Sequence, residues 1–224
     1  MPDRISKLLR DIKLFDNLTE IEFKQLCSAV TTIKFKNNEV IYKEEQDITH
    51  LIYSVNGLVK IYKTEESNYK LVNIITKLNF IDIISSIYYK KYRYTAIAAG
   101  KSTQLYYINI NVIKELKYKN INFVNDLLTK VCETISLFHS FKNDILYKQV
   151  KPKVAYALIY FESVLFDDDN NLVISKHELA DLLYIAHENL SRTLKEFSND
   201  KLIEIKGKSI KILNQKLLLK ICNS

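Results

Sequence analysis

The chain has 224 residues and 47% of them are hydrophobic, so it is long enough for one large or two small domains with their own cores. No apolar run approaches the length of a membrane span, and the amino terminus lacks the apolar block of a signal peptide, so we expect a cytoplasmic protein without membrane contact. The net charge of +7 and the pI near 9.0 favour a polyanionic partner.

The cysteines and the catalytic residue types indicate neither a metal centre nor an enzyme. Cys27, Cys132 and Cys222 are widely separated, with no CxxC pair, which argues against a structural zinc site or a cysteine-ligated iron-sulfur cluster. They are predicted to be reduced thiols, with an isolated redox-sensing cysteine as the alternative. No nucleophile, base and orienting group occur at motif spacing, and there is no phosphate-cradling glycine loop.

Residues 1–119 are predicted to form an antiparallel β-roll preceded by short helices between Ile5 and Val30. Short runs rich in β-branched and aromatic residues are bounded by turn formers, which is typical of strands. The predicted strands cover residues 40–42, 51–55, 58–62, 71–75 and 105–108. Asn56-Gly57, between two apolar runs, predicts a hairpin turn.

Residues 120–149 are predicted to form one long helix with an apolar stripe that repeats every seventh residue. Packing of this stripe on the chain's own β-roll is one explanation. A long helix between two small domains leaves apolar surface uncovered in a monomer, so we favour parallel pairing with a second copy in a homodimer. The expected interface residues are Val124, Leu127, Leu128, Val131, Ile135, Phe138, Phe141 and Ile145.

A break in the chain is expected at Gln149-Val150-Lys151-Pro152, where a third domain of residues 150–224 begins. Pro152 cannot continue the hydrogen bonding of the preceding helix but suits the first turn of a new one. We therefore interpret Lys151 and Pro152 as a hinge.

Residues 175–203 contain two short amphipathic helices. Leu179, Leu182 and Leu183 share one face of the first, and leucines and a phenylalanine recur at helical spacing in the second. The outward stripe of the second helix can hydrogen-bond base edges in the major groove. The expected base-reading residues are His187, Glu188, Ser191 and Arg192.

The following residues 202–212 alternate apolar and polar side chains around Gly207, which predicts a short hairpin. Two helices followed by a lysine-bearing hairpin form a winged helix-turn-helix, with the wing suited to phosphate contact. An ordinary helical hairpin with a solvated charged face is the alternative for the helix pair alone. The expected phosphate-contacting residues are Lys176, Lys195, Lys206 and Lys208.

The order of β-roll, long helix, hinge and winged helix-turn-helix resembles the Crp/Fnr superfamily of bacterial transcription regulators, an α+β fold. The sequence HENLSR supplies Glu188, Ser191 and Arg192, a combination that looks more like the Fnr branch than the cyclic-AMP receptor branch. The resemblance implies a homodimeric DNA-binding regulator, most often an activator that contacts RNA polymerase. It also implies a TTGA-like inverted repeat, with Arg192 on guanine and Glu188 on the opposite cytosine. Tyr184 and Ala186 depart from the family's turn glycine and cap serine.

The resemblance also implies that the β-roll is a sensor domain, but its cyclic-nucleotide residues do not match. Asp82-Ile83 and Arg93-Tyr94 stand where the family presents a Gly-Glu pair and an Arg-Ser or Arg-Thr pair, so we expect no cyclic AMP binding. The iron-sulfur cysteine cluster of the oxygen-sensing relatives is missing as well.

The effector therefore stays open. Asp82, Arg93 and Tyr94 mark a candidate pocket, and the tyrosine-rich stretch around them is either the lining for an anionic aromatic effector or a solvated loop. No cofactor is required, although haem is a candidate. Its candidate axial ligands are His50, His139 and the amino group of Pro2. A ligand-binding module whose carboxy-terminal helices contact a protein partner is the alternative function.

Overall fold

The computed structural model describes residues 2–65, 68–160, 166, 172–207 and 209–223. For Pro2–Arg4 it describes the backbone alone. Contacts divide the chain into two compact units. Unit 1 comprises Met1–Val59 and Ile75–Phe138, and unit 2 comprises Lys60–Ile74 and His139–Ser224. The expected division at residues 119 and 149 stays a prediction. Every helix among the described residues is too short or too polar to span a lipid bilayer.

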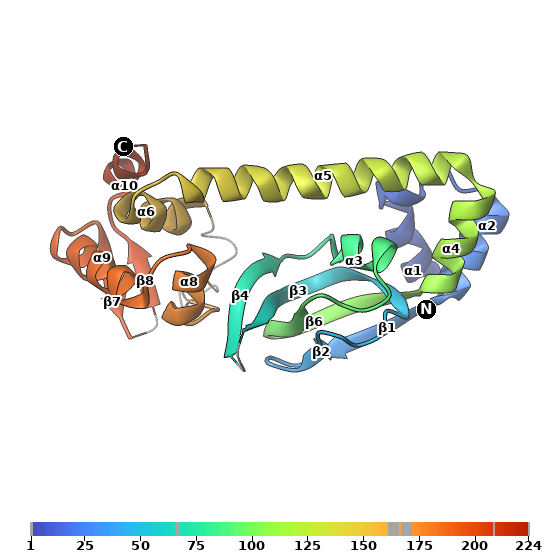
Figure 1. The fold of residues 1–224 in the computed structure, drawn as a ribbon, viewed down its shortest axis with the longest axis horizontal. Helices are drawn as coiled ribbons and strands as arrows, with labels where there is room; N and C mark the ends of the chain where they lie inside the picture. Colours follow the sequence, from blue (N-terminus) through green and yellow to red (C-terminus); the bar gives the residue numbers. More distant parts are fainter. Residues whose placement is uncertain (1, 66–67, 161–165, 167–171, 208, 224) are drawn as a thin grey trace. The chain divides into compact units, whose positions relative to one another are not determined.

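Short helices open the chain, as the sequence predicts. They are α1 (Pro2–Arg10), the 3-10 helix η1 (Lys13–Phe15) and α2 (Glu20–Ser28). Thr19 and Glu22 form a capping box that begins α2, because the Thr19 side chain accepts from the Glu22 N–H and the Glu22 side chain accepts from the Thr19 N–H. These helices lie beside α4 (Ile110–Lys119) where α5 begins (Figure 1).

The β-roll is an antiparallel sheet with the order β1-β6-β3-β4, in which β2 also pairs with β6 and β5 with β3. The strands are β1 (Val30–Phe35), β2 (Val40–Tyr42), β3 (His50–Glu65), β4 (Asn68–Ile75), β5 (Asn79–Ile81) and β6 (Thr95–Asn109), with α3 (Ile83–Tyr88) between the last two. The core of unit 1 joins the sheet to the flanking helices through aromatic side chains such as Phe15, Phe80 and Phe123. This arrangement confirms the expected α+β fold class with a β-roll.

The hairpin predicted at Asn56-Gly57 is wrong, because β3 runs without interruption through both residues. Gly57 has a φ of +90°, and a Cβ atom there would lie 2.6 Å from the Ser102 carbonyl oxygen and from the Thr103 Cα on β6. The glycine therefore permits close approach of two long strands inside a sheet.

The long helix is α5 (Ile121–Leu146), one continuous element (Figure 1). Asn120 begins it by accepting a hydrogen bond from the Phe123 N–H at 3.0 Å. The helix ends before Tyr147, and α6 (Val150–Tyr160) already contains Lys151 and Pro152 in its first turn. The break thus lies at residues 147–149, slightly before the expected hinge, because proline fits the first turn of a helix.

The described elements after α6 form the predicted winged helix-turn-helix, followed by one helix, α10, that was not predicted from the sequence. They are α8 (Lys176–Leu182), α9 (His187–Asn199), β7 (Ile203–Lys206), β8 (Ser209–Ile212) and α10 (Gln215–Cys222). Leu179, Leu183, Leu190, Leu194 and Phe197 are buried, as the periodicity predicts. Gly207 makes the turn of the wing with a φ of +63°.

Candidate nucleic-acid interface

The outward face of α9 presents the side chains expected to read bases. Glu188 and Arg192 are exposed, and His187 and Ser191 are half-buried. The Arg192 Nη2 donates to the Asn189 Oδ1 at 2.8 Å, which holds the guanidinium along the helix. The four residues therefore share one helix, in the arrangement that can enter a major groove.

His187 is held by a contact that the sequence does not reveal. Its ring stacks on that of His177 from α8, with centroids 3.7 Å apart and planes 4° apart. The first and second helices thus meet at the end of α9 where base contact is expected.

The lysines expected to contact phosphates lie in different surroundings. Lys195 and Lys206 are exposed and Lys176 is half-buried, whereas Lys208 lies outside the described residues. Lys206 pairs with Glu204 on the same strand at 2.9 Å, and this hydrogen bond lowers the Glu204 pKa. A phosphate must therefore compete with a carboxylate for Lys206.

The turn between α8 and α9 keeps its shape without glycine. The Tyr184 N–H donates to the Asp181 carbonyl at 3.0 Å and the Ile185 N–H to the Ala180 carbonyl at 3.1 Å, which is a Schellman motif. Tyr184 occupies its left-handed position with a φ of +54°. Ala186 begins α9 without a side-chain cap.

We expect Tyr184→Gly to raise the stability of the folded chain. Glycine adopts this backbone conformation without the penalty that a Cβ atom brings, a gain of about 1 kcal/mol. Thermal unfolding followed by circular dichroism measures it. Ile185→Gly is the control. Ile185 does not have a positive φ, so this variant should lose stability. The Lys142 Nζ lies 5.8 Å from the centre of the Tyr184 ring. Destabilisation by Tyr184→Gly would show that this contact contributes more to stability than the relief of the left-handed backbone.

Lys151, an expected hinge residue, contacts α9 directly. Its Nζ lies 2.9 Å from the Glu196 Oε2, and this hydrogen bond raises the Lys151 pKa. Pro152 is buried in the same turn of α6. The start of α6 is therefore joined to α9 by an ion pair that periodicity in the sequence does not indicate.

The apolar stripe of α5 divides between the chain's own core and solvent. Leu127 and Ile145, expected at a dimer interface, are buried within the single chain, which is a correction for these two residues. Leu128, Ile135 and Phe138 are exposed, and Val124 and Val131 beside them are half-buried, as is Phe141. The outward stripe of α5 therefore consists of Val124, Leu128, Val131, Ile135 and Phe138.

The three expected effector residues have different local contacts. Asp82 begins α3, where its Oδ1 accepts from the Ser85 N–H at 3.4 Å. Arg93 is exposed and its guanidinium lies 5.4 Å from the ring centre of Tyr89. Tyr94 is half-buried. The expected absence of cyclic AMP binding stays a prediction.

Buried tyrosines lie near Asp82 instead. The rings of Tyr42 and Tyr92 stack with centroids 3.6 Å apart, and burial and the nearby Asp82 carboxylate raise both pKa values. Within the described residues, the Tyr42 hydroxyl and the Asp82 Oδ2 are buried without hydrogen-bond partners. Burial also raises the Asp82 pKa. Buried polar atoms of this kind call for a water molecule or a ligand.

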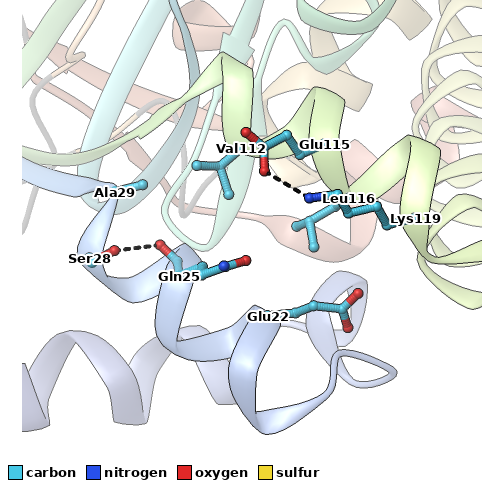
Figure 2. Close-up of a pocket in the computed structure, with 8 residues that line it drawn as sticks. All are labelled: Glu22, Gln25, Ser28, Ala29, Val112, Glu115, Leu116 and Lys119. Carbon is cyan, nitrogen blue, oxygen red and sulfur yellow. Dashed lines mark hydrogen bonds and ion pairs between the residues drawn. The ribbon is translucent and has the colours of Figure 1, made fainter.

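A separate pocket of about 280 Å³ lies between α2 and α4 in unit 1. Figure 2 shows Val112 and Leu116 directed toward α2, with the ion pair of Glu115 and Lys119, 3.4 Å apart, at one side. This pocket contains none of the expected effector residues, and no motif in the sequence pointed to it.

The two histidines expected as haem ligands differ in their exposure and contacts. His139 is exposed on α5, and the His50 Nδ1 lies 2.8 Å from the Thr49 hydroxyl while burial lowers the His50 pKa. The side chain of Pro2 lies outside the described residues. Among the side chains that are placed, no three His, Cys, Asp or Glu residues gather as a metal site.

Two segments of the chain match two family models. The model described as a cyclic nucleotide-binding domain matches residues 32–119, and the Crp-like helix-turn-helix domain matches residues 152–221. The protein is therefore a transcription regulator with a β-roll and a DNA-binding winged helix. Since these two domains together cover most of the sequence, the chain belongs to the Crp/Fnr family.

Solved structures share the fold. A Crp/Fnr-family transcriptional regulator from Eubacterium rectale is 20% identical with a TM-score of 0.80, and the match covers 94% of this chain and 98% of that one. FixK2 from Bradyrhizobium japonicum is 16% identical, with a TM-score of 0.69 and coverages of 86% and 96%. A Crp/Fnr-family regulator from Thermus thermophilus is 17% identical, with a TM-score of 0.70 and coverages of 87% and 99%. No curated protein matches the sequence.

Proposed function

We propose that the protein is a homodimeric regulator that binds a TTGA-like inverted repeat through α9. The observation that carries this proposal is the shared outward face of Glu188, Ser191 and Arg192 on a helix that the Schellman turn and the His177 stack hold in place. Arginine binds the O6 and N7 of guanine, and a carboxylate accepts from cytosine N4. Activation through RNA polymerase follows from the family resemblance.

Dimerisation through α5 is the second part of the proposal. The outward stripe of α5 repeats with alternating steps of four and three residues, the spacing of a coiled-coil seam. Pairing two copies would bury side chains such as Leu128, which is 61% exposed in the single chain. Two recognition helices about 34 Å apart would then match successive turns of the duplex.

The effector is proposed to bind inside the β-roll near Tyr42, Asp82 and Tyr92. The unpartnered Tyr42 hydroxyl and Asp82 Oδ2 favour a small polar molecule that can both donate and accept hydrogen bonds. An effector that binds one arrangement of the dimer better than another shifts the population toward it.

Footprinting on promoter DNA and a salt titration test the DNA-binding function. We expect protection of a palindrome and an affinity that falls steeply as salt rises, because phosphate contacts release counterions. A carboxy-terminal surface that binds a protein partner instead would show no footprint and a much weaker salt dependence. That result would favour the ligand-binding module over the regulator.

A further inference from the structure

An ion pair inside unit 2 joins β3 to the first helix of the winged helix-turn-helix. The Lys60 Nζ lies 2.9 Å from the Glu178 Oε1, and the Tyr62 hydroxyl donates to the same oxygen. The side chains of Lys60 and Glu178 are only 10% and 18% exposed. Charged side chains that are this well buried are rarely found without a partner.

The neighbouring strand makes a second contact with the same helix. The Leu71 N–H of β4 donates to the Asp181 Oδ2 at 3.3 Å. Glu178 and Asp181 stand three residues apart on α8, so both carboxylates lie on one face of the helix. The β3–β4 hairpin, here residues 60–74, therefore engages both acidic side chains of α8.

Glu178 also defines where α8 begins. Its Oε2 accepts from the Ser175 N–H at 2.6 Å, and the Ser175 hydroxyl oxygen accepts from the Glu178 N–H at 3.1 Å. Burial works to raise the Glu178 pKa, but hydrogen bonds from Tyr62, Ser175 and Lys60 outweigh it and lower that pKa. One ionised carboxylate thus caps the helix and anchors it to β3.

We propose that Lys60 and Tyr62 are positioning residues for DNA binding, which orient α8 so that its carboxylates face the β3–β4 hairpin and not the duplex. This inference rests on the proposed function. His177, next to Glu178, stacks on His187, so the anchor is connected to the base-reading end of α9. A buried ion pair adds little net stability, but loss of one partner leaves an uncompensated charge. A released Glu178 carboxylate near the phosphates would repel them.

Fluorescence anisotropy with a duplex carrying a TTGA inverted repeat tests the proposal, at a temperature well below the Tm of each variant. Lys60→Met is expected to weaken binding about tenfold, the size of effect found when residues without ligand contact alter coupling. Tyr62→Phe, which keeps the ring and loses the hydroxyl, is expected to weaken binding about threefold. Lys60→Arg should bind with an affinity within about twofold of the wild-type value, since it keeps the charge.

Two further variants separate positioning from general destabilisation. Lys60→Met combined with Glu178→Gln should regain most of the affinity, because glutamine can maintain the capping box and leaves no unpaired carboxylate. Lys130→Met removes the exposed ion pair of Lys130 and Glu133 on α5 and should leave the affinity unchanged.

Unchanged or tighter binding by folded Lys60→Met and Tyr62→Phe would overturn the inference, while the proposed function would stand if the wild-type chain binds the duplex. Failure of the wild-type chain to bind would overturn both. Loss of affinity in Tyr62→Phe supports the inference even if Lys60→Met does not fold.

Discussion

Arg192→Ala is expected to weaken binding to a TTGA inverted repeat by about 1–3 kcal/mol per contact and to abolish the preference for guanine. The guanidinium is exposed on α9 and already oriented by the Asn189 side-chain oxygen at 2.8 Å. The Arg192 side chain therefore loses little conformational entropy when it binds the edge of the guanine base. Affinities for duplexes with each base at that position measure the effect.

Matched variants separate base reading from attraction to the backbone. Arg192→Lys keeps the charge but not the planar pair of donors, so it should recover part of the affinity and little of the discrimination. Lys206→Ala, on the wing, should weaken all duplexes alike. If Arg192→Ala keeps full discrimination against a changed guanine, the assignment of this residue to base reading is wrong.

Leu128→Glu combined with Ile135→Glu is expected to convert the proposed dimer into monomers and to remove binding to the full palindrome. Carboxylates that must be buried unpaired at the seam cost several kcal/mol, so the dimer Kd should rise by a factor of at least about 100. The two side chains are 61% and 39% exposed in the single chain, so its fold should survive. Sedimentation velocity measures whether the variant is a monomer, and circular dichroism measures whether it remains folded.

Leu137→Glu provides the control for this experiment. Leu137 is 69% exposed on the same helix but lies far around it from the outward stripe of α5, so the variant should remain dimeric. A wild-type chain that sediments as a monomer, or a double variant that still dimerises, would contradict pairing through this stripe.

The sequence predicted the winged helix-turn-helix well because its signals are local. The buried positions of α8 and α9 recur within one helix, and Gly207 marks the wing turn inside a short hairpin. Tyr184 was recognised as a departure from the family's glycine, but its left-handed backbone could only be seen in the structure. Local periodicity indicates which face is buried and says little about unusual backbone angles.

Features that depend on distant contacts were not predictable in the same way. Asn56-Gly57 has the composition of a hairpin turn, yet tertiary pairing of β3 with β6 keeps the strand continuous through it. Leu127 and Leu128 are equally apolar, and only the position of the unit 1 core decides that Leu127 is buried. The contact of Lys60 with Glu178 joins residues 118 positions apart, for which no pattern within one sequence provides a signal.

Helices α8 and α9 end in the same Schellman motif, and this affects how the protein tolerates mutation. After α9, the Lys201 N–H donates to the Ser198 carbonyl and the Leu202 N–H to the Phe197 carbonyl, and Lys201 has a φ of +55°, as Tyr184 has +54° after α8. Each left-handed position thus carries a side chain where glycine would relax the backbone. Two single substitutions are therefore available as suppressors, which could offset destabilising changes on the reading face and leave room for new operator preferences to evolve.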